Sequence, residues 1–426
     1  MKPRPLQNKR SGFRQKAALF NFLGFAALCR DAATFNKIFP AALVLAAATM
    51  DLNAALPYPI VGTGQTKCYD NHNEITPPKP GQPFYGQDAQ FQDAQPGYRD
   101  NGDGTVSDLN TGLMWLKARG QKMSWDDAMA GAKTCRVGGH DDWRMPTIKE
   151  LYSLIQFTGQ CMATTGSRPF LDTNYFGFIY GDTSHGERMI DCQDWSATKY
   201  IGTTMNGNTT AFGVNFADGR IKGYPVFDPR SHGPHKLFVR YVRGNPAYGK
   251  NDFQDNGDGT ITDRAMGLTW SKTDSGTGMN WPQALAWVQQ KNAKKFLGHN
   301  DWRLPNAKEL QSLLDYSRIP AIAPVFQISK LADGEYPWFW TSTTHLDGPP
   351  DRAGGAAVYV AFGRALGWMQ FLPGRGEYRL LDVHGAGAQR SDPKEGNPAM
   401  FPHGRSPQGD VIRIYNFVRL VRGGLD

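Results

Sequence analysis

The chain has 426 residues, of which 40% are hydrophobic and 20% are charged. At about 150 residues per domain, this length predicts two or three domains. The balance of apolar, charged, glycine and proline residues excludes a coiled coil, a collagen, a wholly disordered chain and a polytopic membrane protein. The formal net charge is +8, but residues 1–55 hold eight Lys or Arg against Asp31 and Asp51. The remainder is therefore nearly neutral, and we expect no nucleic-acid partner.

Residues 1–55 have the features of a leader that directs export. A basic start precedes two apolar runs, 17–29 and 38–50, before the small residues Ala54 and Ala55. Each run is too short to span a bilayer. The pattern is typical of a secretory signal peptide, with a buried alanine-rich helix or an uncleaved anchor as the alternative. We therefore expect a periplasmic, cell-surface or extracellular protein with no stable membrane span after cleavage.

The rest of the chain contains a tandem duplication. Three blocks of the first half return in the same order in the second half, and each half closes on the pattern Val-Arg-x-Val-Arg-Gly. The blocks are 100–108 and 255–263, 112–115 and 267–270, and 139–146 and 298–305. This periodicity predicts two domains, copy one at 98–245 and copy two at 253–424. Residues 56–97, rich in Pro, Gln and Gly, are predicted to be an irregular N-terminal segment.

Each copy is predicted to place its helices early and its strands late. In copy one a turn at 110–112 joins strands at 105–108 and 113–116, and Ser124 and Thr147 are suited to start two helices. Copy two repeats these starts at Asn280 and Asn306. Later segments such as 211–216 and 357–362 read as strands. This order predicts an α+β domain, not a parallel βαβ sheet.

The copies differ in length at two places. From Trp143 to Trp195 is 14 positions longer than from Trp302 to Trp340. Cys161 and Cys192 both lie in that longer stretch, so we expect them to form a disulfide. Cys68 and Cys135 would then tie the N-terminal segment to copy one, although four cysteines allow three pairings.

The second difference lies near the end of the chain. Copy two has 34 more positions than copy one between the last matched tryptophan and the closing arginine. We assign these residues to a long Gly- and Pro-rich loop at 374–409. A loop of this length is usually functional or disordered, so it is the predicted place of copy-specific recognition.

The candidate ligand-binding residues lie in or near that loop. Eight of the eleven tryptophans form matched pairs between the copies, which predicts that they build the two cores. Two unmatched ones, Trp338 and Trp368, are candidates for sugar stacking if exposed and for core packing if not. His384, His403 and Arg405 are the other candidate ligand contacts. Arg144 and Arg303, by contrast, are expected to pair with local carboxylates.

The repeated Asp-Asn-Gly-Asp-Gly block is the candidate metal site. Closely spaced carboxylates around glycine suit calcium, the one candidate cofactor. The alternative is a tight turn in which each aspartate accepts hydrogen bonds from backbone amides. The carboxylates concerned are Asp100, Asp103 and Asp108 in copy one and Asp255, Asp258 and Asp263 in copy two.

As a set, these motifs resemble the bacterial family designated DUF1566, named also for the C-terminal domain of the Legionella collagen-like adhesin. The element from Arg303 to Leu310 is similar to one in C-type-lectin-like and formylglycine-generating-enzyme-like domains. The resemblance implies two tandem C-type-lectin-like domains, each with two helices and a mainly antiparallel sheet. The adhesin implies binding of sulfated glycans, whereas the near-neutral charge of residues 56–426 argues against a preference for polyanions.

These observations predict an exported, non-catalytic binding or adhesion protein that recognises a glycan or a surface protein. No catalytic residue is predicted, because the sequence has neither a nucleophile elbow nor a dinucleotide-binding glycine motif. One alternative is an enzyme of the formylglycine-generating type, which would need Cys135, Cys161 or Cys192 as a reactive thiol. Another is a structural envelope protein.

Overall fold

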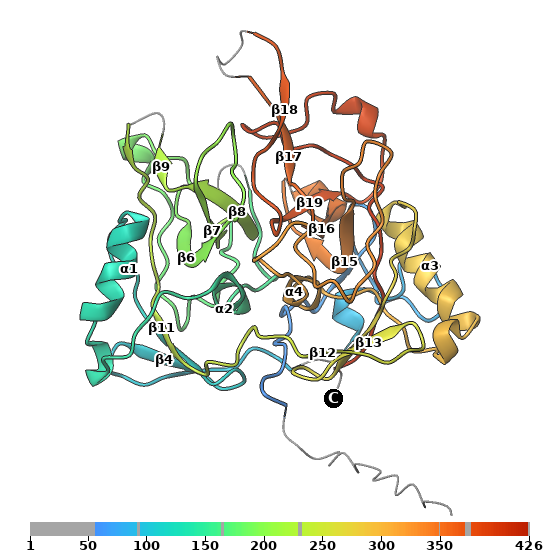
Figure 1. The fold of residues 1–426 in the computed structure, drawn as a ribbon, viewed down its shortest axis with the longest axis horizontal. Coiled ribbons are helices and arrows are strands. Elements are labelled where there is room, and N and C mark those ends of the chain that lie inside the picture. Colours follow the sequence, from blue (N-terminus) through green and yellow to red (C-terminus); the bar gives the residue numbers. More distant parts are fainter. Residues whose placement is uncertain are drawn as a thin grey trace, which may run out of the picture. The chain divides into compact units, whose positions relative to one another are not determined.

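The computed structural model describes residues 56–91, 94–162, 166–228, 232–348, 350–370 and 376–424 (Figure 1). The predicted leader and its signal peptide, 1–55, lie outside the described residues. Within the described ranges, no helix is both long enough and apolar enough to cross a membrane. The helices and strands form an α+β structure whose named strands all pair antiparallel.

Each copy begins with a hairpin sheet that its own last strand completes. In copy one the strand order is β11-β5-β4-β3, and in copy two it is β12-β13-β14-β20. The closing strands place Val242 opposite Trp115 and Val421 opposite Trp270, so both ends of each copy meet in one sheet. The bounds are Tyr98–Asp100 (β3), Thr105–Asp108 (β4), Leu113–Leu116 (β5), Val242–Gly244 (β11), Phe253–Asp255 (β12), Thr260–Asp263 (β13), Leu268–Ser271 (β14) and Val421–Gly423 (β20).

The predicted helix starts are confirmed. Ser124 caps α1 (Trp125–Thr134) and Thr147 caps α2 (Ile148–Ser153), while Asn280 and Asn306 cap α3 (Trp281–Ala293) and α4 (Ala307–Ser312). Each cap side chain accepts a hydrogen bond from a backbone amide of the first turn, which satisfies a donor that the helix itself leaves without a partner. Short 3₁₀ helices lie at Asp88–Gln90 (η1), Val137–Gly139 (η2), Thr183–His185 (η3), Phe296–Gly298 (η4), Pro350–Gly355 (η5) and Pro398–Met400 (η6).

The late strands of both copies join in one six-stranded sheet, in the order β15-β16-β19-β8-β7-β6. Each copy supplies three strands, so β6, β7 and β8 of copy one correspond to β15, β16 and β19 of copy two. At the junction, β19 and β8 share only the pair Gln389 and Ile221. The bounds are Asp194–Lys199 (β6), Thr210–Asn215 (β7), Arg220–Pro225 (β8), Trp338–His345 (β15), Ala356–Ala361 (β16) and Gln389–Pro393 (β19).

Partly buried ion pairs lie beside this junction. Arg220 of β8 contacts Asp347 of copy two and lies 3.5 Å from Asp218, which also accepts from Lys222 at 2.7 Å. Burial lowers the pKa of nearby His345 to about 4, so its ring is neutral at pH 7. These ion pairs link the copies where the strand pairing is shortest.

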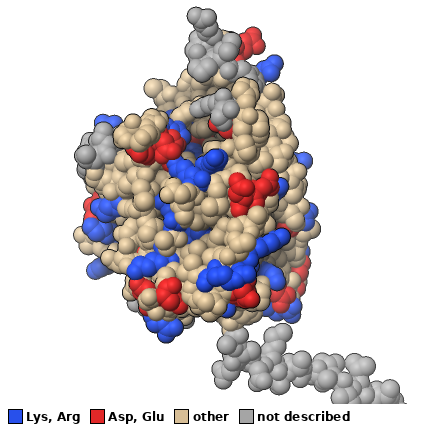
Figure 2. All heavy atoms as spheres, turned by 90° about the vertical axis from the view of Figure 1, so that its left-hand side faces the viewer, with Lys and Arg blue, Asp and Glu red and all other residues tan. Residues whose placement is uncertain are grey.

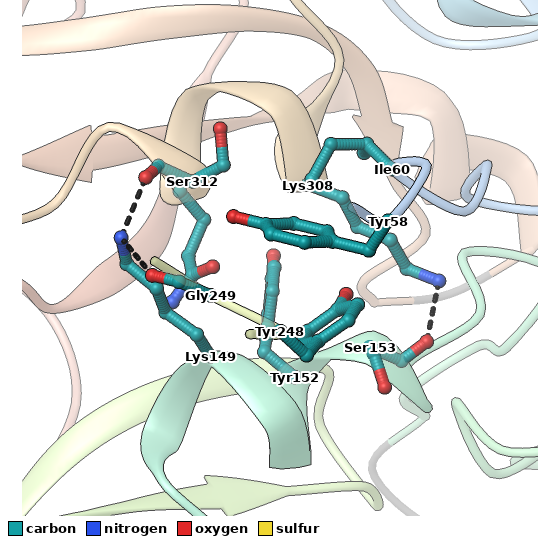
Figure 3. Close-up of a pocket in the computed structure, with 10 residues that line it drawn as sticks. Tyr58, Ile60, Lys149, Tyr152, Ser153, Tyr248, Gly249, Lys308 and Ser312 are labelled. Carbon is teal, nitrogen blue, oxygen red and sulfur yellow. Dashed lines mark hydrogen bonds between the residues drawn. The ribbon is translucent and has the colours of Figure 1, made fainter. Parts of the chain in front are cut away.

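The copies also exchange lysine contacts between matched helices (Figure 3). Lys149 of α2 donates to the carbonyl of Ser312, the last residue of α4, at 2.7 Å. Its counterpart Lys308 of α4 donates to the carbonyl of Ser153, the last residue of α2, at 2.8 Å. Burial lowers the pKa of Lys149 to about 8. Each copy thus supplies a donor to a C-terminal carbonyl of the other copy's helix. The cavity beside these lysines has a volume of about 10 Å³, which is too small for an organic ligand.

The N-terminal segment contacts both copies: the Phe157 amide of copy one donates to the Thr63 carbonyl at 2.8 Å, whereas Cys68 lies beside Lys394 of copy two. Gln65 exchanges two hydrogen bonds with the backbone of Thr344, both 2.9 Å long. Buried Asp88 accepts from Thr343 at 2.5 Å, and burial raises the pKa of Asp88 to about 6. The short strands of this segment are β1 (Cys68–Tyr69) and β2 (Glu74–Ile75). Its polar groups therefore find partners on β15, on Phe157 of copy one and on Lys308 of α4.

The predicted disulfides are wrong, because all four cysteines of the described residues are free. Cys68 lies beside Lys394 of copy two, whereas Cys135 ends helix α1 of copy one. The backbone of Cys161 pairs with Leu346, and the Cys192 thiol faces the carbonyl of Met189 at 3.7 Å. Each thiol is thus held by its own surroundings and not by a second sulfur.

The matched tryptophans build the core as expected. Seven of the eight are buried, and the largest apolar cluster includes residues of both copies, among them Trp115 and Trp270. The predicted pairing of the matched arginines is also confirmed: Arg144 binds Glu150 and Arg303 binds Glu309. On the outside, the face that includes α1 carries Lys and Arg among Asp and Glu (Figure 2), so charge of one sign does not dominate it.

Candidate functional site: a groove in copy two

The extra residues of copy two do not form the single loop 374–409 that the sequence suggested. They divide into two excursions, because β19 returns to the central sheet in the place that β8 occupies in copy one. The first excursion, 362–388, contains the hairpin of β17 (Leu366–Met369) and β18 (Arg379–Asp382), at the top of Figure 1. The second excursion, 394–413, contains η6. In copy one, β7 and β8 are joined by a tight turn and only the short pair β9 (Phe227–Asp228) and β10 (Gly233–Pro234) follows.

The two excursions pack against each other. The Trp368 amide donates to the Gly409 carbonyl at 2.8 Å, and the Val411 amide donates to the Leu366 carbonyl at 3.0 Å. Residues 409–411 therefore lie along β17 on the side opposite β18. This arrangement gives the hairpin a third backbone segment that copy one does not have.

His384 anchors this arrangement and does not face a ligand, contrary to the prediction. It is 4% exposed, and its Nε2 lies 2.7 Å from Oδ1 of Asp410 in the second excursion. Burial, reinforced by the charge of Arg390, lowers the pKa of His384 to about 4. The ring is therefore neutral at pH 7 and donates its proton to Asp410, whose other oxygen contacts Arg390.

A groove of about 360 Å³ lies between the two excursions and residues 331–338. Its volume is within the range of small-ligand sites. Most of its lining is aliphatic or aromatic, with three polar side chains among them. The lining residues are Leu331, Asp333, Pro337, Trp338, Leu366, Trp368, Leu380, Pro398, Val411, Ile412, Arg413 and Tyr415.

The two candidate tryptophans meet in this groove, but only one is available to a ligand. Trp338 is 1% exposed and stacks on Tyr359, with ring centroids 4.6 Å apart and planes 1° apart. It is thus the core tryptophan that the alternative interpretation described. Trp368 is partly exposed, and it lines the groove from β17.

His403 and Arg405 lie beside the groove without lining it. The His403 ring stacks on Tyr378 at a centroid distance of 3.6 Å and meets the edge of Trp368 at 6.4 Å. The Arg405 guanidinium lies 4.2 Å from the ring centroid of Phe401. His403 therefore extends the aromatic surface outward from Trp368, while Arg405 supports the second excursion.

Sequence reasoning missed the three polar lining residues. Asp333 accepts from the Glu335 amide at 3.0 Å, Arg413 donates to the Tyr336 carbonyl at 3.3 Å, and Tyr415 is 47% exposed. Burial lowers the pKa of Arg413. Arg413 lies at the end of the second excursion and Tyr415 lies just beyond it. A predicted insertion that continued past residue 409 to the closing strand would have included both. No signal marks Asp333, which lies before β15.

The repeated aspartates form turns in both copies. Asp100 and Asp255 accept from the amides of Gly102 and Gly257 at 3.0 Å, and Asp103 and Asp258 accept from the Thr105 and Thr260 amides. Asp108 accepts from two further amides, and Asp263 does the same. Across the described ranges, no three acidic, histidine or cysteine side chains converge to hold a metal ion. The turn interpretation thus accounts for these residues, and a calcium site has no assembled ligand set here.

Three of the four thiols in the described residues have a raised pKa. Burial raises the pKa of Cys161 and of Cys192 to about 12 and that of Cys68 to about 11. A reactive cysteine needs the opposite shift, because the thiolate is the nucleophile. None of these three sulfurs belongs to the groove lining.

Comparison with known families agrees with these motifs. A family model described as the Lcl C-terminal domain matches residues 104–243 and 259–380, which is more than half of the chain. The chain belongs to this family. The two matches correspond to the two copies, and the resemblance seen in the sequence motifs is confirmed. The second match ends at Leu380 within β18, so the second excursion of this Lcl C-terminal domain protein lies beyond it. No curated protein and no solved structure matches the chain.

Proposed function

We propose that the protein is an exported, non-catalytic binding protein of the cell surface that holds a glycan in the groove of copy two. The observation that carries the proposal is that the groove is lined largely by the two excursions. These excursions are the residues that distinguish copy two from copy one. A duplicated scaffold with one elaborated copy is typical of a recognition site added to a stable framework.

Three further features support the proposal. The predicted leader and membership of the Lcl C-terminal domain family favour a place outside the cytoplasm. The order of helices and antiparallel strands is compatible with the C-type-lectin-like interpretation of each copy. Partly exposed Trp368 provides an apolar ring face of the kind on which sugars stack.

A protein partner is the second candidate, favoured by the outer edge of β18. Among the described strands β18 pairs with β17 alone, and Tyr378 just before it and Leu380 within it are 40% and 41% exposed. An open edge with apolar side chains can accept an additional strand. The Met205 amide of copy one already donates to the Asp382 carbonyl at one end of that edge.

The test is binding of the purified protein to a glycan array and to isolated envelope proteins, in calcium and again in chelator. Trp368→Ala should weaken binding about tenfold or more, which corresponds to about 1.4 kcal/mol. The matched control is Phe227→Ala in copy one, because Phe227 is also aromatic and is 51% exposed. Binding that survives the Trp368 change would show that the groove is not the site. Loss of binding in chelator would support a calcium requirement.

A further inference from the structure

We infer that the groove recognises an uncharged sugar, with the apolar face of the ring on Trp368 and its hydroxyl groups on Asp333, Arg413 and Tyr415. This inference rests on the proposed function and specifies its ligand class. It follows from the polar groups that the groove leaves open, from the balance of its charges and from its apolar wall.

The first argument concerns hydrogen bonds. One oxygen of Asp333 is engaged by a backbone amide and one nitrogen of Arg413 by a backbone carbonyl. Within the described part of the chain, the other Asp333 oxygen, the remaining Arg413 donors and the Tyr415 hydroxyl have no hydrogen-bond partner. An acceptor, a planar donor and a hydroxyl on one lining match the alternating donors and acceptors of neighbouring sugar hydroxyls.

This arrangement disfavours a purely apolar occupant. A leucine or phenylalanine side chain from a protein partner would cover these polar groups without replacing their water. Each buried polar group left without a partner costs about 1–3 kcal/mol. A ligand that fills the groove must therefore bring polar groups of its own.

The second argument concerns charge. Arg413 is the single basic residue of the lining and Asp333 the single acidic one. The acids Asp333, Asp392 and Glu335 act on the charge of Arg413, and Glu335 also pairs with Arg364. A sulfate or carboxylate would meet these acids, and an ammonium group would meet Arg413. The lining thus favours a ligand without net charge.

The third argument concerns the apolar wall. Leu366, Leu380 and Val411 line the groove together with the partly exposed Trp368. The C–H face of a pyranose ring suits such a wall, while its hydroxyl groups point toward the rim. One apolar face and one polar edge on the same lining fit a sugar better than either a lipid chain or a small ion.

The experiment uses the purified protein and an array of uncharged hexose and N-acetylhexosamine oligosaccharides, each beside its sulfated and carboxylated derivatives. We expect saturable binding to at least one uncharged sugar and at least about tenfold weaker binding to its charged derivatives. Kd should change less than about twofold between about 50 and about 500 mM NaCl, because no ion pair forms.

Two variants test the groups named above. Trp368→Ala and Asp333→Ala should each raise Kd about tenfold, whereas Phe227→Ala should leave it unchanged. Asp333 is exposed, so we expect Asp333→Ala to fold. This variant therefore keeps the test valid even if Trp368→Ala, which changes a partly buried residue, does not fold. Circular dichroism checks both.

The outcomes separate this inference from the proposed function. Binding to sulfated or carboxylated sugars alone, with a steep salt dependence, would overturn the uncharged class and leave a binding protein. If the protein binds envelope proteins but no sugar, and Trp368→Ala abolishes that binding, the sugar assignment is overturned. The groove would then remain the binding site. Binding that neither groove variant weakens would overturn both.

Discussion

The duplication provides a matched test of how burial sets the energy of an ion pair. In copy two, Arg303 binds Glu309 through two hydrogen bonds of 2.5 Å, and the two side chains are 3% and 4% exposed. In copy one, Arg144 binds Glu150 through bonds of 2.6 and 2.5 Å, but the Arg144 side chain is 36% exposed. The two glutamates are equally buried, and the main difference is the access of the arginine side chain to water.

Arg303→Met should therefore destabilise the protein more than Arg144→Met. Removing one partner of a buried pair leaves an uncompensated charge and costs about 3–5 kcal/mol. Each variant also removes an arginine bond to a closing-strand carbonyl, that of Gly423 in copy two and that of Gly244 in copy one. In copy one the Glu150 side chain is 3% exposed, but removal of the more exposed Arg144 opens a path for water to this carboxylate, so we expect a loss of about 1–2 kcal/mol. Methionine keeps most of the apolar stem in both variants.

Urea denaturation followed by tryptophan fluorescence measures both losses against the wild-type protein. The measurements are made at pH 8. Equal losses for the two variants at pH 8, or a larger loss for Arg144→Met, would refute the reasoning from burial.

Two further predictions concern buried titrating groups. His384, whose pKa falls from 6.5 to about 4 on folding, contributes stability that is complete above pH 6.5 and lost as the pH falls toward 4. This contribution to the free energy of unfolding amounts to about 3 kcal/mol. In urea titrations at several pH values, His384→Gln should remove this part of the pH dependence. A pH profile of stability that is the same in the variant and the wild type would contradict the prediction. For the thiols, a thiol reagent should modify Cys135 at least about tenfold faster than buried Cys68 and Cys192. Mass mapping of the labelled cysteines checks this order, and a disulfide among them would contradict the structure.

Short-range features of the fold were predictable. Ser124, Thr147, Asn280 and Asn306 start helices because each supplies a side-chain acceptor to amides two or three residues away. The Asp-Asn-Gly-Asp-Gly turns need only local hydrogen bonds and glycines at positive φ, such as Gly102 and Gly104. The matched arginines find glutamates six residues later. In each case the partners are fixed by a short stretch of backbone.

Long-range partners were not predictable in the same way. The sequence placed Cys161 near Cys192 by loop length, but pairing with Leu346 of copy two decides where Cys161 lies. It likewise placed the N-terminal segment on copy one alone, whereas Thr343 and Thr344 of β15 also bind it. Such contacts join residues far apart in the chain, and no local pattern records them.

The sequence by itself thus determined the duplication, the α+β class, the helix starts, the tryptophan cores and the copy that carries the elaborated site. Only the tertiary structure decided that the extra residues form two excursions with Trp368, Asp333 and Arg413 around one groove. The physical reason is the return of β19 to the central sheet beside β8. That pairing depends on buried groups from both copies, and it divides a stretch that looks continuous in the sequence.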